Sequence, residues 1–322
     1  LVNTNQHYIN IMSKVFFNFF KISKPKYNIK APISTYGSFF SKTIKEIENI
    51  LFKEKPNYLI VQGDTNTAFA GCFAASIYNR KYFENYHKIK IVHIEAGLWS
   101  FDERMPEEIN RKLIDQLSNI LFVPTQVDIE NLKKERLMLN KEVFKVGNTI
   151  SDSIKKYSPL IKKNNIVKNL NLSKDDYFLI TLHRPETVDN HVEFQKLILI
   201  FEKIGKKFNK KFIFPTHPRT KKIMKKMTTN KMNFIKFIEP LEFIDFLSLM
   251  KNSNIVFTDS GGVQEETSLL GVPCITIRKS TERQITIKEK TNILTGYDYT
   301  QISKAIVHFN NNKIKPSNTF GD

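Results

Sequence analysis

Short apolar runs alternate with longer amphipathic stretches along most of the chain. The apolar runs are rich in β-branched and aromatic residues, and they predict strands at 58–62, 89–94, 120–124, 143–147, 177–182, 212–216, 234–238, 255–259 and 274–278. Helical spacing of apolar positions predicts helices at 38–54, 65–79, 105–118, 126–138, 191–208, 242–252, 263–270 and 299–311. This alternation is typical of α/β proteins with parallel sheets and crossover helices.

A polar segment rich in Lys and Asn, from about residue 155 to 175, interrupts the alternation. We therefore place a domain boundary near residue 152, between an N-terminal Rossmann-like domain (1–152) and a C-terminal one (153–322). A length of 322 residues suits two domains. The expected architecture is two doubly wound parallel-sheet domains facing each other across a cleft, with ligands at the carboxyl ends of the strands.

The composition is that of a globular protein, with 41% hydrophobic and 25% charged residues. Uninterrupted apolar runs such as 197–201 are far shorter than the roughly 20 residues that span a bilayer. The two cysteines, Cys72 and Cys274, lie far apart without metal-ligand spacing, so neither a disulfide framework nor a metal site is expected. With no signal peptide visible, a cytoplasmic location is expected.

The formal net charge of +18 suggests a polyanionic partner such as nucleic acid. However, only eight of the 50 basic residues are Arg, and the lysines are spread over the predicted surfaces instead of forming a stripe. A general bias toward Lys in the proteins of the host explains this distribution better than a nucleic-acid partner does. An Arg in this background marks a place where a planar, bidentate donor is needed.

A glycine-rich turn follows the strand at 255–259. Ser260, Gly261 and Gly262 lead directly into a helix, where exposed backbone N–H groups and the helix dipole form an anion site. The alternative is an ordinary helix cap by Asp259 or Ser260. Glu266 follows one turn later, where a carboxylate can accept from ribose hydroxyls. The GxGxxG fingerprint does not occur in the sequence, so no nicotinamide cofactor is expected.

Three acidic residues follow strands or begin helices in the first domain. Asp64 follows the strand at 58–62, Glu95 ends the apolar run at 91–94, and Glu107 begins a helix. Several carboxylates in one cleft suit general acid/base catalysis. Asp64 could instead be a helix cap, and Glu107 could form an ordinary i,i+4 salt bridge with Arg111.

The second domain adds two histidines that follow strands, His183 and His217, each of which precedes an Arg. Arg283 follows the strand at 274–278 and could reach phosphates near the glycine-rich turn. Phe246 lies on a predicted helix, where an aromatic side chain belongs to the core more often than it stacks on a base.

These segments resemble the non-hydrolysing UDP-N-acetylglucosamine 2-epimerase family over essentially the whole chain. The motifs that carry the resemblance occur in the family's order and spacing at 4–8, 61–67, 93–97, 106–111, 146–149, 181–184, 259–266 and 281–283. The resemblance implies two Rossmann-like domains in the GT-B arrangement, a UDP-sugar substrate, no cofactor and a homodimer, with no nucleic acid or membrane as partner.

The resemblance also implies a role for each matching residue. Residues that would hold UDP are Phe246, Ser260, Gly261, Gly262, Glu266 and Arg283. Residues that would surround the reacting sugar are Asp64, Glu95, Glu107, Arg111 and His183. Residues that match positions binding a second UDP-sugar, as activator, in some members are Gln6, Arg184 and His217.

Some family features differ here. The family's opening strand with its Gly-Thr-Arg-Pro-Glu loop has no counterpart before Leu1, and its final helix has none after Asp322, so the resemblance implies a fragment truncated at both ends. Trp99 stands where the family usually has Arg. Pro185 after His183 and Arg184 is unusual in the family, and Gln284 and Ile285 stand where the family usually has Pro-Glu.

The expected activity is epimerisation at C2 of UDP-N-acetylglucosamine to UDP-N-acetylmannosamine, by elimination and re-addition of UDP, in polysaccharide biosynthesis. One alternative is the same reaction on a UDP-diacetamido uronic acid, since the enzymes that act on such substrates have similar sequence motifs at the positions of 102–111 and 215–220. Others are a GT-B glycosyltransferase, an inactive UDP-sugar-binding module and, from charge alone, a nucleic-acid-binding protein.

Overall fold

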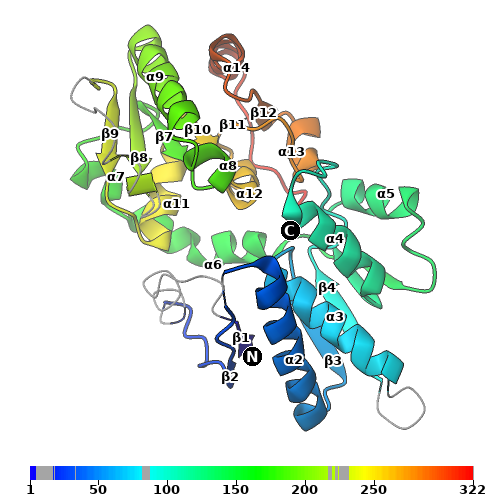
Figure 1. Cartoon of the computed structure of the whole chain (residues 1–322). Helices are drawn as coiled ribbons and strands as arrows, with labels where there is room; N and C mark the ends of the chain where they lie inside the picture. The colour runs from blue at the N-terminus through cyan, green and yellow to red at the C-terminus, as the bar shows by residue number, and fades with distance from the viewer. Residues whose placement is uncertain are drawn as a thin grey trace. The chain divides into compact units, whose positions relative to one another are not determined.

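Parallel β-sheets with flanking helices organise the chain in the computed structural model (Figure 1). The structure describes residues 1–4, 17, 19–32, 34–81, 88–216, 220–221, 224 and 232–321. The chain divides into two compact units, Leu1–Val146 and Gly147–Asp322, and the division falls a few residues before position 152. The α/β fold class predicted from the sequence is confirmed.

Unit 1 contains a parallel sheet with the strand order β3-β4-β5-β6. Its strands are β3 (Tyr58–Gln62), β4 (Lys90–Ile94), β5 (Ile120–Val123) and β6 (Glu142–Lys145). A separate parallel pair consists of β1 (Val2–Asn3) and β2 (Tyr27–Asn28). The helices of this unit are α2 (Tyr36–Glu54), α3 (Asn66–Lys81), α4 (Pro106–Leu117) and α5 (Gln126–Lys134). Buried side chains from α2, α3 and α4 pack with those of β3 and β4 in one cluster, while α5 packs with β5 in another.

Unit 2 contains a parallel sheet with the strand order β12-β11-β10-β7-β8-β9. Its strands are β7 (Tyr177–Thr181), β8 (Lys211–Pro215), β9 (Ile235–Ile238), β10 (Ile255–Thr258), β11 (Cys274–Thr276) and β12 (Asn292–Leu294). The helices are α6 (Thr149–Lys163), α7 (Ile166–Asn169), α8 (Pro185–Val188), α9 (His191–Phe208), α11 (Phe243–Lys251), α12 (Gly261–Leu270), α13 (Gln284–Lys288) and α14 (Tyr299–Asn311).

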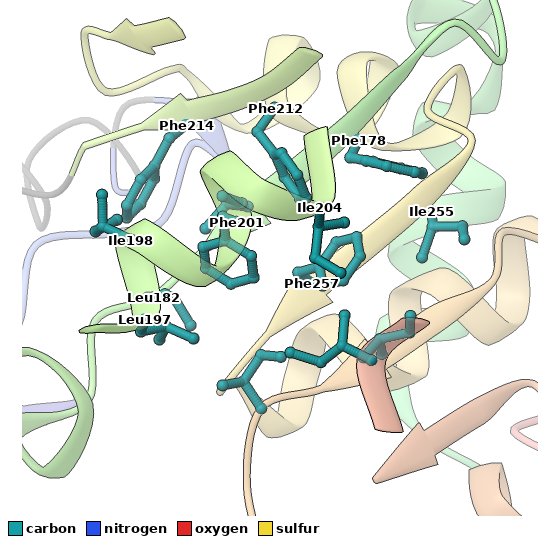
Figure 2. Packing of buried hydrophobic residues seen from close by; sticks show 14 of the residues in the cluster. Phe178, Leu182, Leu197, Ile198, Phe201, Ile204, Phe212, Phe214, Ile255 and Phe257 are labelled. Atoms are coloured by element: carbon teal, nitrogen blue, oxygen red, sulfur yellow. The ribbon is translucent and has the colours of Figure 1, made fainter. Parts of the chain in front are cut away.

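Helices cover both faces of the sheet in unit 2, which explains why its central strands are apolar throughout. Alternate residues of β7, β8 and β10 pack with α9 and α14 on one face, and the intervening residues pack with α6, α11 and α12 on the other. Three phenylalanines from neighbouring strands form the centre of the first cluster (Figure 2). The ring centroids of Phe178 and Phe212 lie 4.9 Å apart, and those of Phe212 and Phe257 lie 5.1 Å apart.

The polar segment at 155–175 is not a break in structure, because most of its first half belongs to helix α6. This helix contains Pro159 and many lysines, which hide its amphipathic pattern. Its apolar positions Ile154 and Ile161 are buried in the second cluster of unit 2. The helix therefore contributes to the core of that unit.

The chain order creates a topological switch point in unit 2. From β7 the chain proceeds outward through β8 to β9, and it then returns to form β10 on the other side of β7. In open parallel sheets, ligands bind outside the carboxyl ends of the two strands at such a point. The loops that follow β7 and β10 are therefore the expected position of a ligand site.

Candidate functional site

The buried carboxylate of Asp259 joins the two loops at the switch point. It accepts hydrogen bonds from the backbone N–H groups of His183, at 3.1 and 3.2 Å, and Arg184, at 3.0 Å. The interpretation of Asp259 as the cap of α12 is therefore wrong, because its oxygens face the loop after β7. The side chain of His183 is 45% exposed, and its Nδ1 lies 3.5 Å from Asp259.

Ser260 occupies the N-cap position of α12, but its side chain makes no capping hydrogen bond. The side-chain cap considered as an alternative for Ser260 is therefore wrong as well. With no side chain bound over them, the N–H groups that begin α12 are oriented to bind an anion.

The two glycines of this turn differ in what surrounds them. A Cβ on Gly261 would clash with Oε1 of Glu282, whereas a Cβ on Gly262 would meet no atom of the described residues within 4 Å. A side chain at position 261 would therefore have to displace the carboxylate of Glu282. The open space beside Gly262 is available to a ligand.

Arg283 lies beside this turn, as the sequence predicted, with its Cζ 3.5 Å from the position of a Gly261 Cβ. Its Nε lies 3.1 Å from Oε1 of the buried Glu265, which also accepts a 3.0 Å hydrogen bond from Nδ2 of Asn148. The backbone N–H of Arg283 donates to Thr281. These contacts fix the guanidinium next to the glycines, where it can neutralise a phosphate.

Glu282 was not singled out from the sequence, yet it contacts two arginines near the turn. Its carboxylate lies 3.0 Å from Nη1 of Arg278 and 3.4 Å from Nη2 of Arg184. Arg184, a candidate residue of an activator site, therefore contacts the same carboxylate that lies beside Gly261. The signal that could have found Glu282 is its place between the matched Thr281 and Arg283.

Glu266 and Phe246 complete the candidate nucleotide residues of unit 2. Burial raises the pKa of Glu266 to about 8, and the charge of Glu265 adds to the shift. Phe246 on α11 packs against the buried cluster that contains Leu247 and Ile154. The structure thus places Phe246 at the edge of the hydrophobic core, in agreement with the interpretation of this side chain as a core residue.

The carboxyl ends of β3 and β4 lie side by side in unit 1, because Gln62 pairs with Ile94 in the sheet register. Glu95 follows the end of β4 directly, and Asp64 follows the end of β3 after one residue, Gly63. Asp64 does not cap α3, since Oγ1 of Thr65 accepts the helix N–H from Ala68. Asp64 instead forms an ion pair with Arg111, so the cap interpretation is wrong.

Arg111 is buried and connects α4 to the loop after β3. In addition to Asp64, its guanidinium contacts Glu108, with Nη1 2.9 Å from Oε2. Instead of the i,i+4 pair with Glu107 considered as an alternative, Arg111 contacts Asp64 and Glu108. Nδ2 of Asn110 donates to the carbonyl of Asp64 at 2.9 Å and further fixes this loop.

The adjacent glutamates Glu107 and Glu108 have different environments. Glu108 is buried and accepts hydrogen bonds from Ser100 and from the backbone of Phe101, all at 2.9 Å. Its role is to hold the loop after β4. Glu107 has a buried Oε2 that lacks a hydrogen-bond partner among the described residues, so that oxygen can accept a bond from a ligand.

Glu95 adopts a left-handed backbone conformation with φ of 72°, which is uncommon for a residue other than glycine. Its Oε1 accepts a 2.9 Å hydrogen bond from Nε2 of Gln62. Backbone strain of this kind clusters at active sites. Two candidate activator residues, Gln6 and His217, lie outside the described residues.

Two parallel-sheet units are present, with a glycine-rich turn at a topological switch point in unit 2 and carboxylates at strand ends in unit 1. This arrangement is typical of α/β enzymes that bind nucleotides. Among the described residues, we find no group of side chains that could hold a metal ion and no helix able to cross a membrane. The family model for UDP-N-acetylglucosamine 2-epimerase matches residues 1–322. The chain belongs to this family, and it is an isomerase.

Relatives support the same assignment along the whole chain. A UDP-N-acetylglucosamine 2-epimerase of Methanocaldococcus jannaschii is 43% identical, and the match covers 100% of this chain and 87% of the relative. A UDP-2,3-diacetamido-2,3-dideoxy-D-glucuronate 2-epimerase of Pseudomonas aeruginosa is 37% identical over 92% of this chain and 79% of the relative.

Solved structures agree with the fold. The crystal structure of the M. jannaschii UDP-GlcNAc 2-epimerase with UDP-GlcNAc and UDP has a TM-score of 0.88 at 43% identity, covering 100% of this chain and 87% of that chain. The Neisseria meningitidis UDP-GlcNAc 2-epimerase bound to UDP-GlcNAc has a TM-score of 0.83 at 28% identity, covering 98% and 86%.

Proposed function

We propose that the protein interconverts UDP-N-acetylglucosamine and UDP-N-acetylmannosamine. The observation that carries this proposal is the 43% identity over the whole chain to the M. jannaschii UDP-N-acetylglucosamine 2-epimerase. A structure of a protein of that description, at the same identity, contains UDP-GlcNAc and UDP. No cofactor takes part in the proposed reaction.

The proposed reaction proceeds by elimination and re-addition. A base removes the proton from C2 of the sugar, the C1–O bond breaks, and UDP leaves with its electron pair to give a 2-acetamidoglucal. A proton then adds to the opposite face of C2, and a phosphate oxygen of UDP returns to C1. Asp64, Glu95 and Glu107 carry out the proton transfers, with His183 and Arg111 beside the sugar.

The residues of unit 2 hold UDP in this proposal. Ser260 begins this turn, and its own N–H donates to Oγ1 of Thr258 at 2.9 Å. The N–H groups of Gly261 and Gly262, together with the guanidinium of Arg283, stabilise the charge on the departing diphosphate. Glu266 binds the ribose and Phe246 lies near the base. Gln6, Arg184 and His217 form a second UDP-sugar site that activates the enzyme.

Following the C2 hydrogen tests this function. With UDP-N-acetylglucosamine in D₂O, the protein should produce the manno epimer with deuterium at C2, measured by NMR and mass spectrometry. A glycosyltransferase or a binding module would leave C2 unlabelled. An epimer without deuterium would contradict elimination and point to oxidation elsewhere on the ring.

A UDP-diacetamido uronic acid is the second candidate substrate, favoured by the 37% identity to the P. aeruginosa enzyme. The ratio of kcat/KM for the two substrates in the same deuterium assay distinguishes these candidates. A larger value for the uronic acid would reassign the substrate while keeping the reaction.

We also propose a cytoplasmic homodimer whose product is used in polysaccharide biosynthesis, as the family resemblance implies. Light scattering coupled to size-exclusion chromatography measures the assembly. A monomer at micromolar concentration would contradict the dimer.

A further inference from the structure

A buried histidine–aspartate pair lies beneath the carboxylates of unit 1. The side chains of His93 on β4 and Asp115 on α4 are fully buried, with Nδ1 of His93 2.6 Å from Oδ1 of Asp115. The other ring nitrogen, Nε2, lies 3.0 Å from the carbonyl oxygen of Gly63. None of the roles proposed above uses this pair.

The contacts of the pair indicate a charged imidazole. A backbone carbonyl can only accept, so Nε2 of His93 must carry a proton. Asp115 accepts two further hydrogen bonds at Oδ2, from the N–H of Gly97 at 3.0 Å and from Nε1 of Trp99 at 2.8 Å. Because these donors stabilise the ionised carboxylate, Nδ1 of His93 carries a proton as well.

The surrounding charges are consistent with an imidazolium. Burial opposes the charge, but the Asp115 carboxylate, the bond to Gly63 and the charge of Glu95 raise the pKa of His93 above its ordinary value. Lys141 is another charged group near the pair, and its Nζ donates to the backbone carbonyl of Asp115 at 2.9 Å.

The pair connects the two loops that carry candidate catalytic carboxylates. Through His93, Asp115 holds Gly63, the residue before Asp64. Directly, Asp115 holds Gly97, which follows Glu95 by two positions. A single buried carboxylate thus fixes the ends of both β3 and β4.

We propose that His93 and Asp115 form a positioning ion pair that sets Asp64 and Glu95 for proton transfer at C2 of the sugar. The inference rests on the proposed epimerase function. Neither residue of the pair touches the substrate; each acts through the loop that it holds. A displacement of about 1 Å in such a loop can lower turnover about 100-fold.

Asp115→Asn removes the negative charge of the side chain and keeps its shape, so it tests the charge alone. The Asn amide oxygen can still accept from Gly97 and Trp99, and its NH₂ can donate to a neutral His93 that keeps its bond to Gly63. His93→Gln is the second variant, since the Gln amide can reach Gly63 but carries no charge. Ser118→Ala is the matched control, because Ser118 is buried at the end of the same helix and bonds to Ile114 and not to the pair.

The experiment measures kcat and KM for C2 exchange, UDP affinity, and the ¹⁵N shifts of His93 in the full chain. We expect both ring nitrogens of the parent to be protonated, and the Asp115→Asn ring to be neutral. Both Asp115→Asn and His93→Gln should lower kcat about 10- to 100-fold, with KM and UDP affinity within about twofold of the parent. Ser118→Ala should keep the parent's kcat.

A neutral His93 in the parent would overturn the inference, as would full kcat in either charge-removing variant that folds. An equal loss in Ser118→Ala would also overturn it, because general destabilisation would then explain the effect. A parent that exchanges no deuterium would instead overturn the proposed function. The two failures are thus distinguished by the activity of the parent.

Discussion

The two glycines of the turn in unit 2 have different surroundings. Gly261 lies against Glu282, and Gly262 faces open space. A substitution at Gly261 therefore tests the stability of the protein, and a substitution at Gly262 tests the binding of the ligand. This difference makes the two positions a matched pair for experiment.

Gly262→Val should abolish UDP binding while the protein stays folded, because the added Cβ meets no described protein atom within 4 Å and the side chain occupies the approach of the phosphate. Titration calorimetry with UDP and a thermal melt measure the two effects. In contrast, Gly261→Ala should lower Tm, since its methyl group clashes with Glu282. Equal UDP affinity in Gly262→Val and the parent would show that the phosphate binds elsewhere.

Removing single charges from the unit 1 carboxylates should slow the reaction. Asp64→Asn, Glu95→Gln and Glu107→Gln should each lower turnover about 10²- to 10⁴-fold and leave UDP affinity nearly unchanged. Glu103→Gln is the control, since Glu103 is exposed in the same loop region. A loss of tenfold or less would assign the residue a structural role.

The raised pKa of Glu266 makes stability depend on pH. The folded protein holds a proton up to about pH 8 that the unfolded chain releases near pH 4.5. Its contribution to stability is therefore complete below about pH 4.5 and is lost as pH rises toward 8. Tm should fall less over pH 5 to 8 in Glu266→Gln than in the parent. Parallel curves for the two proteins would contradict a protonated Glu266.

Part of the site could be predicted from single residues and part could not. Asp64, Glu95, Ser260 and Arg283 follow strands, and strand ends are visible as the ends of apolar runs. Buried groups such as Asp115, Glu265 and Glu282 lie inside helices or loops, where a charged residue normally indicates an exposed face. Only the tertiary structure reveals that their partners are buried with them.

At the scale of helices and strands, the apolar runs predicted the strands from β3 to β11. The signal is strongest for β7, β8 and β10, because parallel strands buried on both faces are continuously hydrophobic. β12 was not predicted, since Asn292–Leu294 is too short to give a periodic signal. Helix α6 was not predicted because Pro159 and its lysines obscured the pattern. Its three buried positions are nevertheless enough to attach it to the core.

Adjacent residues of α6 provide a test of this attachment. Ile161 is 2% exposed and lies in the buried cluster beneath the sheet of unit 2, whereas Leu160 is 51% exposed. Ile161→Ala should lower the free energy of unfolding by about 2 to 4 kcal/mol. Leu160→Ala should change it by less than about 0.5 kcal/mol, a typical surface effect. Denaturant titration measures both, and equal effects would mean that α6 does not pack as described.

At the scale of the whole molecule, the dominant feature is the net charge of +18 spread over many lysines. Such a surface attracts any polyanion through counterion release, without recognising a sequence. The charge is therefore compatible with a nucleotide-sugar enzyme. It also raises the local concentration of an anionic substrate.

Binding of duplex DNA should accordingly be weak and sensitive to salt. Fluorescence anisotropy should detect binding at about 50 mM NaCl and lose it by about 200 mM, with the same affinity for unrelated sequences. Binding that persists at the higher salt with a sequence preference would support the nucleic-acid alternative. A free oligolysine of similar charge serves as the control for the purely electrostatic contribution.

Trp99, whose indole donates to Asp115, is the only tryptophan in the sequence. It is fully buried, and Nζ of Lys112 lies 5.8 Å from its ring centroid. All tryptophan fluorescence of the protein therefore originates next to the loops that carry Asp64 and Glu95. The wild-type chain contains its own optical reporter, which allows stopped-flow emission to follow events in unit 1 without an attached dye.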